Sequence, residues 1–107
     1  MIETKFEFSM INEKLVERII DDENVNINHM ILTKDTCIPE HFSNSNVYMI
    51  IVRGTMSIGL SEQDFHRYEK GSMLNIPYNV KMNVCNHDDE VLEFFVIKSP
   101  APKNYGK

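Results

Sequence analysis

The sequence predicts an all-β fold, an antiparallel β-barrel, for most of this 107-residue chain. From residue 25 onward, apolar and polar residues alternate with the period of a strand, as in Val25-Asn26-Ile27-Asn28. Short apolar runs such as Met49 to Val52 are bounded by polar turns, which recur at intervals of about 8–12 residues. Short strands joined by close turns are typical of a barrel or sandwich.

The predicted strands follow one another along the chain with clear turn signals between them. They lie at residues 25–30, 49–52, 56–60, 65–69, 80–84 and 91–97, and a further strand follows Gly71. The polar stretch 61–64 joins two of these strands into a hairpin. Gly71 forms a turn, Pro77 closes the strand before it, and residues 86–89 make a further polar turn. Pro100 and Pro102 end the fold in a short tail.

The N-terminal segment has a different pattern. Ile11, Leu15 and Ile19 recur at helical spacing, and Ser9 is available as an N-cap. This pattern predicts a short helix, with a strand over part of the segment as the alternative. The resulting organisation is an N-terminal element at 1–24 that packs on the barrel or on a dimer partner, a barrel at 25–98 and a tail at 99–107.

Charge and composition exclude several classes of partner. The formal net charge is -5 and the basic residues are scattered, which disfavours binding to nucleic acid. No apolar stretch approaches the length of a membrane span, and the N-terminus does not resemble a signal peptide. We therefore expect a cytoplasmic protein. Cys37 and Cys85 form no Cys-x-x-Cys pair and are predicted to be reduced thiols.

Several glycine, histidine and proline residues are spaced as in two known motifs. His41 heads a segment that runs into Gly54, and sixteen residues then lead to Gly71, with Pro77 and Asn86 beyond. This pattern resembles the two signature motifs of the cupin superfamily over most of the chain. The resemblance implies a double-stranded β-helix, or jelly roll, of the kind that usually holds a metal on three histidines and a glutamate.

Most of the metal ligands that this resemblance implies are missing. His41 occupies the first histidine position, but Ser43, Val47 and Met82 replace the second histidine, the glutamate and the third histidine. Valine has no lone pair, serine is a poor neutral ligand and methionine suits mainly Cu(I), so one good ligand remains. We predict no bound metal and no other cofactor. A rearranged metal site that includes His41 is the alternative.

Two further positions depart from the motifs at turns. Asp35 and Asn79 stand where the family has glycine. Aspartate, like glycine, is a turn-forming residue, so the exchange at Asp35 is tolerable. Gly54, Gly71 and Pro77 are interpreted as turn geometry, and Asn86 as a side chain that satisfies backbone groups at a strand end.

With its ligands replaced, the barrel mouth becomes less polar. The residues predicted to line a ligand pocket there are His41, Ser43, Val47, Met49, Tyr78 and Met82. For the two methionines, the preferred interpretation is that they simply fill the core, and a place in the pocket is the alternative. These residues predict a metal-free barrel that binds a small, partly apolar molecule, or acts as an accessory or regulatory module.

Two other predictions complete the functional interpretation. The alternative function is a cupin enzyme, of isomerase, epimerase or metal-dependent dioxygenase type, with a rearranged site around His41. A metal-independent epimerase would need an acid–base pair, for which His41 with Tyr48 or Tyr78 is the candidate. The apolar N-terminal segment, which can cover the sheet edge of a partner, predicts a homodimer.

Overall fold

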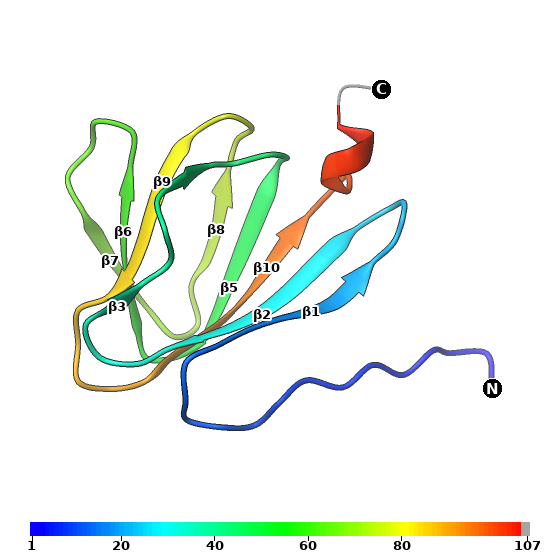
Figure 1. The fold of residues 1–107 in the computed structure, drawn as a ribbon, viewed down its shortest axis with the longest axis horizontal. Coiled ribbons are helices and arrows are strands. Elements are labelled where there is room, and N and C mark those ends of the chain that lie inside the picture. The colour runs from blue at the N-terminus through cyan, green and yellow to red at the C-terminus, as the bar shows by residue number, and fades with distance from the viewer. Residues whose placement is uncertain (106–107) are drawn as a thin grey trace.

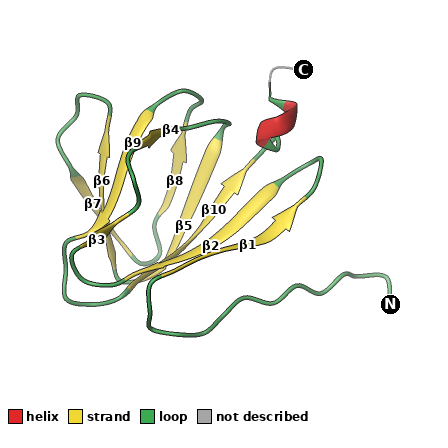
Figure 2. Cartoon of the chain, viewed as in Figure 1, coloured by secondary structure: helices red, strands yellow, loops and turns green. Residues whose placement is uncertain are grey.

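The structure is a computed structural model that describes residues 1–105, and it confirms the all-β barrel of two antiparallel sheets (Figures 1 and 2). The first sheet contains, in spatial order, β1 (Leu15–Asp21), β2 (Asn26–Leu32), β10 (Leu92–Lys98), β5 (Val47–Arg53) and β8 (Met73–Ile76). The second contains β3 (Thr36–Cys37), β9 (Lys81–Asn86), β6 (Thr55–Leu60) and β7 (His66–Glu69), with β4 (His41–Phe42) also paired to β9. A 3₁₀ turn, Pro102–Asn104, lies in the tail. Among residues 1–105, no helix is long and apolar enough to cross a membrane.

One apolar core fills the space between the two sheets. Alternate side chains of β5 and β10 point inward from the first sheet, and those of β6 and β9 meet them from the second. The members of this core cluster are Leu32, Val47, Met49, Ile51, Met56, Ile58, Ile76, Met82, Val84, Leu92, Phe94 and Val96. Each is at most 4% exposed, so the barrel interior is packed with side chains.

The predicted N-terminal helix is wrong, and the alternative, a strand over part of the segment, is correct. β1 pairs with β2, and Leu15 and Glu17 lie opposite Ile31 and His29. The register shifts between Arg18 and Ile20, as a β-bulge does. The bulge places two consecutive half-buried isoleucines on one strand, and this interruption of the two-residue period imitates helical spacing. Residues 1–14, called the N-terminal arm below, form no helix or strand and precede β1 as an extended segment (Figure 1).

The prediction of two reduced thiols is also wrong for this structure. Cys37 on β3 and Cys85 on β9 are direct partners in the ladder, with their Cα atoms 4.0 Å apart, and their sulfurs form a disulfide. The two cysteines are 48 residues apart in the sequence. Their spacing could not reveal this contact, because it depends on the register of two strands from different parts of the chain.

The turn positions identified in the sequence adopt left-handed backbone conformations. Gly54 and Gly71 have φ values of 79° and 91°, and Asp35 and Asn79 have 61° and 64°. Asparagine and aspartate are the side-chain-bearing residues that tolerate this region best. Asp35 and Asn79, which stand where the motifs have glycine, therefore preserve the two turns.

Asn86 connects three segments at the end of β9. Its side chain is fully buried and donates hydrogen bonds to the carbonyl oxygens of Leu32 (2.9 Å) and Glu90 (2.8 Å). Its Oδ1 accepts a bond from the backbone N–H of Asp88 at 2.9 Å. This asparagine thus satisfies backbone groups that would otherwise be buried without partners.

The two left-handed glycines should respond differently to alanine. A Cβ added at Gly71 would meet open space. Gly71→Ala should therefore lower the free energy of unfolding by about 1–2 kcal/mol, the cost of the left-handed conformation alone. At Gly54 an added Cβ would collide with the carbonyl oxygen of Val91 and lie 2.9 Å from Cα of Leu92. Gly54→Ala should therefore lose about 1–3 kcal/mol more. Equal losses of unfolding free energy in the two variants, measured in urea, would contradict the close packing at Gly54.

Candidate functional site

The structure buries three of the predicted pocket residues inside the barrel core. Val47, Met49 and Met82 are 0%, 2% and 2% exposed, and all three belong to the core cluster. They fill space between the sheets, as the preferred interpretation of the two methionines predicts.

Ser43 is buried as well, but its hydroxyl has a structural task. It donates a hydrogen bond to the carbonyl oxygen of Pro77 at 2.6 Å and accepts one from the backbone N–H of Val80 at 2.8 Å. The backbone N–H of Ser43 also donates to the Val80 carbonyl at 2.9 Å. These bonds fix the connection between β8 and β9, so the hydroxyl is already engaged.

The two remaining pocket candidates lie at the surface. His41 is exposed on β4, and its Nδ1 lies 2.9 Å from the carbonyl oxygen of Pro39. Tyr78 is 49% exposed and stacks on Tyr105, with ring centroids 4.3 Å apart. The four positions of the family's metal ligands thus offer one exposed imidazole, one engaged hydroxyl and two core side chains. This set does not fit a divalent metal.

A polar cluster that sequence reasoning missed lies on the outer face of the first sheet, the face that points away from the second sheet. His29 is 0% exposed, and both of its ring nitrogens meet carboxylates. Nδ1 lies 2.8 Å from Oε1 of Glu17 on β1, and Nε2 lies 2.6 Å from Oε2 of Glu93 on β10. Arg53 on β5 adds an ion pair, with Nε 3.0 Å from Oε1 of Glu93. We call these four residues the ionic cluster.

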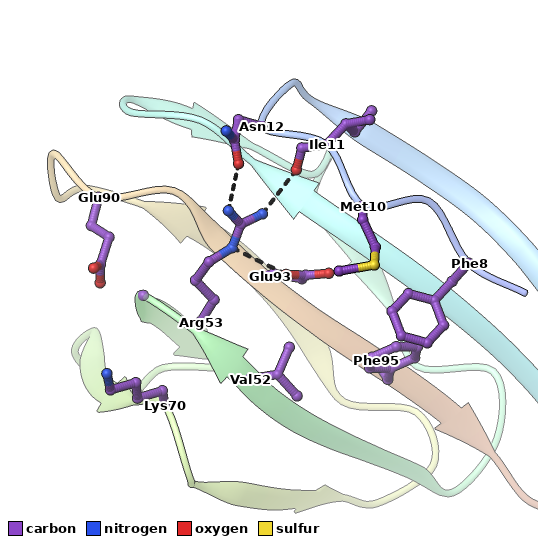
Figure 3. Close-up of a pocket in the computed structure, with 11 residues that line it drawn as sticks. Phe8, Met10, Ile11, Asn12, Val52, Arg53, Lys70, Glu90, Glu93 and Phe95 are labelled. Atoms are coloured by element: carbon purple, nitrogen blue, oxygen red, sulfur yellow. Dashed lines mark hydrogen bonds and ion pairs between the residues drawn. The ribbon is translucent and has the colours of Figure 1, made fainter.

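The ionic cluster binds the N-terminal arm at two points. At one end, the backbone N–H and the hydroxyl of Ser9 donate to the Glu17 carboxylate at 2.7 and 2.9 Å. At the other end, the Arg53 guanidinium donates to Oδ1 of Asn12 at 2.5 Å and to the carbonyl oxygen of Ile11 at 2.9 Å (Figure 3). Ser9, expected to cap a helix, instead anchors an extended segment.

The aromatic rings of Phe8 and Phe95 pack against His29 of the ionic cluster. The Phe8 ring lies 5.0 Å from the His29 ring and meets Phe95 edge-on at 4.9 Å. His29 and Phe95 are themselves 4.8 Å apart. These rings keep water away from His29, which strengthens its two hydrogen bonds.

The geometry around His29 suits a doubly protonated ring. An imidazolium would donate to both carboxylates, one hydrogen bond from each ring nitrogen. In that form, imidazolium and guanidinium would balance the two carboxylates. The hydrogen bond from the Ser9 backbone also lowers the pKa of Glu17, more than burial raises it.

A groove of about 550 Å³ opens beside the ionic cluster, between the arm and the sheet (Figure 3). Its apolar lining comes from Phe8, Met10, Ile11, Val52 and Phe95. Charges of both signs stand around these side chains, from Arg53, Lys70, Glu90 and Glu93, and Asn12 and Gly54 complete the lining. The volume is in the range of small-molecule sites, about 300–1,000 Å³.

Only part of this site carried a signal in the sequence. Arg53 and His29 were visible as a charge at a strand end and an imidazole within a strand, but nothing in the spacing joins them to Glu17 and Glu93. A further sign was that Glu93 and Phe95 alternate with apolar residues along one strand, which places a phenylalanine on an outer face. Because a solvated face rarely needs phenylalanine, such a residue indicates that something covers it.

Comparison with known proteins finds a near relative that matches most of the chain. The chain is 42% identical over 104 residues to the uncharacterised protein MJ0764 of Methanocaldococcus jannaschii, a match that covers 96% of this chain and 90% of the relative. The crystal structure of that protein, described as an RmlC-like cupin family protein with a double-stranded β-helix fold, superposes with a TM-score of 0.96. There the identity is 41%, covering 100% of this chain and 99% of the other. No family model matches the chain.

More distant solved structures share the fold alone. A conserved double-stranded β-helix protein of Klebsiella pneumoniae is 11% identical, with a TM-score of 0.78 over 92% of this chain and 85% of its own. A cupin superfamily protein of Desulfitobacterium hafniense is 13% identical, with a TM-score of 0.73 over 87% and 83%.

Glu17 should give the protein a characteristic pH dependence. Because its pKa in the folded state lies below the ordinary 4.5, its contribution is complete above that value and is lost as pH falls through the folded pKa. Glu17→Gln should cost about 1–2 kcal/mol near neutral pH, and this difference should shrink in acid. Unfolding in urea across this pH range measures it. The control is Glu7→Gln, on the exposed part of the arm, and a Glu17→Gln deficit independent of pH would contradict the assignment.

Proposed function

We propose that this chain, which belongs to the RmlC-like cupin family, binds a small, partly apolar molecule on the outer face of its first sheet. The observation that supports this proposal is the groove beside the ionic cluster, whose walls are apolar and whose rim is charged. The barrel mouth, where the sequence placed the pocket, has its candidate side chains in the core, engaged in backbone bonds or at the surface.

The lining suggests the chemistry of the ligand. Phe8, Met10 and Val52 provide an apolar wall that suits a hydrocarbon or aromatic group. Lys70 and Glu90 add one positive and one negative charge at the exposed rim. A molecule with an apolar body and a charged end would satisfy both parts. An accessory or regulatory role would use the same groove, with the ligand as its signal.

The enzyme alternative receives less support. An acid–base pair must converge on one substrate, but the His41 imidazole is exposed on β4 and turned to its own backbone at Pro39. Tyr78 is stacked on Tyr105 in the C-terminal tail. Tyr48 belongs to the outer face of the first sheet, whereas His41 is paired with the second.

An amphipathic fluorescent probe tests the groove. The naphthalene sulfonate dye ANS has an apolar ring system and one negative charge, and its emission should rise on titration with the protein. Val52→Asp places a carboxylate in the apolar wall and should weaken dye binding about tenfold or more, equivalent to about 1.4 kcal/mol.

The matched control for this titration is Val16→Asp. Val16 is 59% exposed, against 45% for Val52, and lies outside the groove lining. The Val16→Asp protein should bind the dye as tightly as the parent protein does. Equal losses in the two variants, or none in a folded Val52→Asp protein, would refute the groove as the binding site.

A second proposal concerns assembly as a homodimer. Ile2 and Phe6 of the arm are 104% and 51% exposed, although both are apolar, and neither lines the groove. The outer face of the first sheet also leaves Met73 exposed (68%), outside the groove. A twofold partner that receives the arm of one chain on the sheet face of the other would bury both surfaces at once.

Light scattering tests this assembly. The expected mass is about 25 kDa, twice the 12.5 kDa of one chain. Phe6→Asp should raise the dimer dissociation constant about tenfold or more, because it would bury a charge in the interface. Phe42→Asp, at a similarly exposed phenylalanine (56%) on the second sheet, should leave it unchanged. A wild-type mass near 12.5 kDa at micromolar concentration would refute the dimer.

The proposal includes a cytoplasmic location. In that compartment thiols are kept reduced, so the Cys37–Cys85 disulfide would be opened or formed only transiently. The state of this pair in protein isolated under thiol-blocking conditions is the direct check.

A further inference from the structure

The outer face of the second sheet carries a group of metal-binding side chains remote from the family's usual metal position. Cys37 on β3 and Cys85 on β9 are paired across the ladder. His87 follows Cys85 by two residues and lies one residue beyond the end of β9. The ligand atoms of all three residues lie within 4.8 Å of one another.

We propose that the reduced protein binds one thiophilic divalent cation, Zn²⁺ being the best match, on the thiolates of Cys37 and Cys85 and the imidazole of His87. Two sulfurs and one nitrogen are a preferred ligand set for zinc, and a fourth, tetrahedral position would remain for water or a ligand. The proposal is independent of the groove, which lies on the other sheet.

The disulfide makes this site redox-controlled. In the oxidised protein the two sulfurs are bonded to each other, so neither is a thiolate. Two equivalents of a thiol reductant break the S–S bond, giving two cysteine thiols and one oxidised reductant disulfide. The cation then displaces two protons and bonds to both sulfurs and to His87. Oxidation of the pair by a small disulfide reverses the process and releases the cation.

The surrounding structure favours such a site. Adjacent antiparallel strands hold the two cysteines face to face, so the ligands are preorganised in either redox state. Cys37 and His87 are exposed, which gives the cation a path from solvent, whereas Cys85 is 2% exposed. The His87 ring also packs against Phe65, with centroids 5.5 Å apart, and this contact limits its freedom.

Cobalt is the spectroscopic probe for this site. Reduced protein titrated with Co²⁺ under anaerobic conditions should develop a sulfur-to-cobalt charge-transfer band that saturates at one equivalent, together with the visible bands of tetrahedral cobalt. Zinc should abolish both. Protein with the disulfide intact should show neither band. A reduced wild type without the charge-transfer band would overturn the proposal.

Single-residue variants test which side chains bind the metal. Cys85→Ser and Cys37→Ser should each remove most of the charge-transfer intensity, and His87→Gln should weaken cobalt binding about tenfold or more. His66→Gln alters another exposed histidine of the same sheet and should bind like the parent. His87→Gln retains both cysteines, so it tests the ligand set even if a serine variant does not fold. Wild-type affinity in His87→Gln, or a loss in His66→Gln equal to that in His87→Gln, would refute the assigned site.

Discussion

The buried contact of His29 with two carboxylates is the interaction on which the outer face of the first sheet depends. Without Glu17 and Glu93 on either side, a fully buried imidazolium would be untenable, and without Arg53 the two carboxylates would carry excess negative charge. The cluster joins four strands of the first sheet, and its outer members hold the N-terminal arm through Ser9 and Asn12. The arm in turn forms one wall of the groove. The ionic cluster therefore holds in place the segment that lines the groove.

The chain thus keeps the cupin scaffold but places its polar chemistry elsewhere. In the family pattern the polar groups converge inside the barrel, whereas here Val47 and Met82 complete an apolar core and Ser43 fixes a loop. Outside the barrel, the first sheet presents the ionic cluster and the second presents the Cys37–Cys85 pair with His87. Val47 and Met82 thereby contribute to a well-packed interior behind these two outer faces.

Local pattern in the sequence was enough to predict most strands and turns, because alternation and turn residues report directly on backbone conformation. Asp35 and Asn79 were recognisable at positions where only residues tolerant of left-handed φ fit. Long-range contacts could not be predicted in the same way. The Cys37–Cys85 pairing depends on strand register, and the ionic cluster joins residues from β1, β2, β5 and β10. The helix prediction failed because a bulge in β1 imitates helical spacing.

The central claim is that His29 is a buried imidazolium held between Glu17 and Glu93, and nitrogen NMR of the histidine rings tests it most directly. Near neutral pH the account predicts that Nδ1 and Nε2 of His29 both carry protons, and that these protons exchange slowly with water. His41, which is exposed, serves as the internal reference for a ring open to solvent. A His29 ring with one unprotonated nitrogen, or one whose protons exchange as fast as those of His41, would contradict the account.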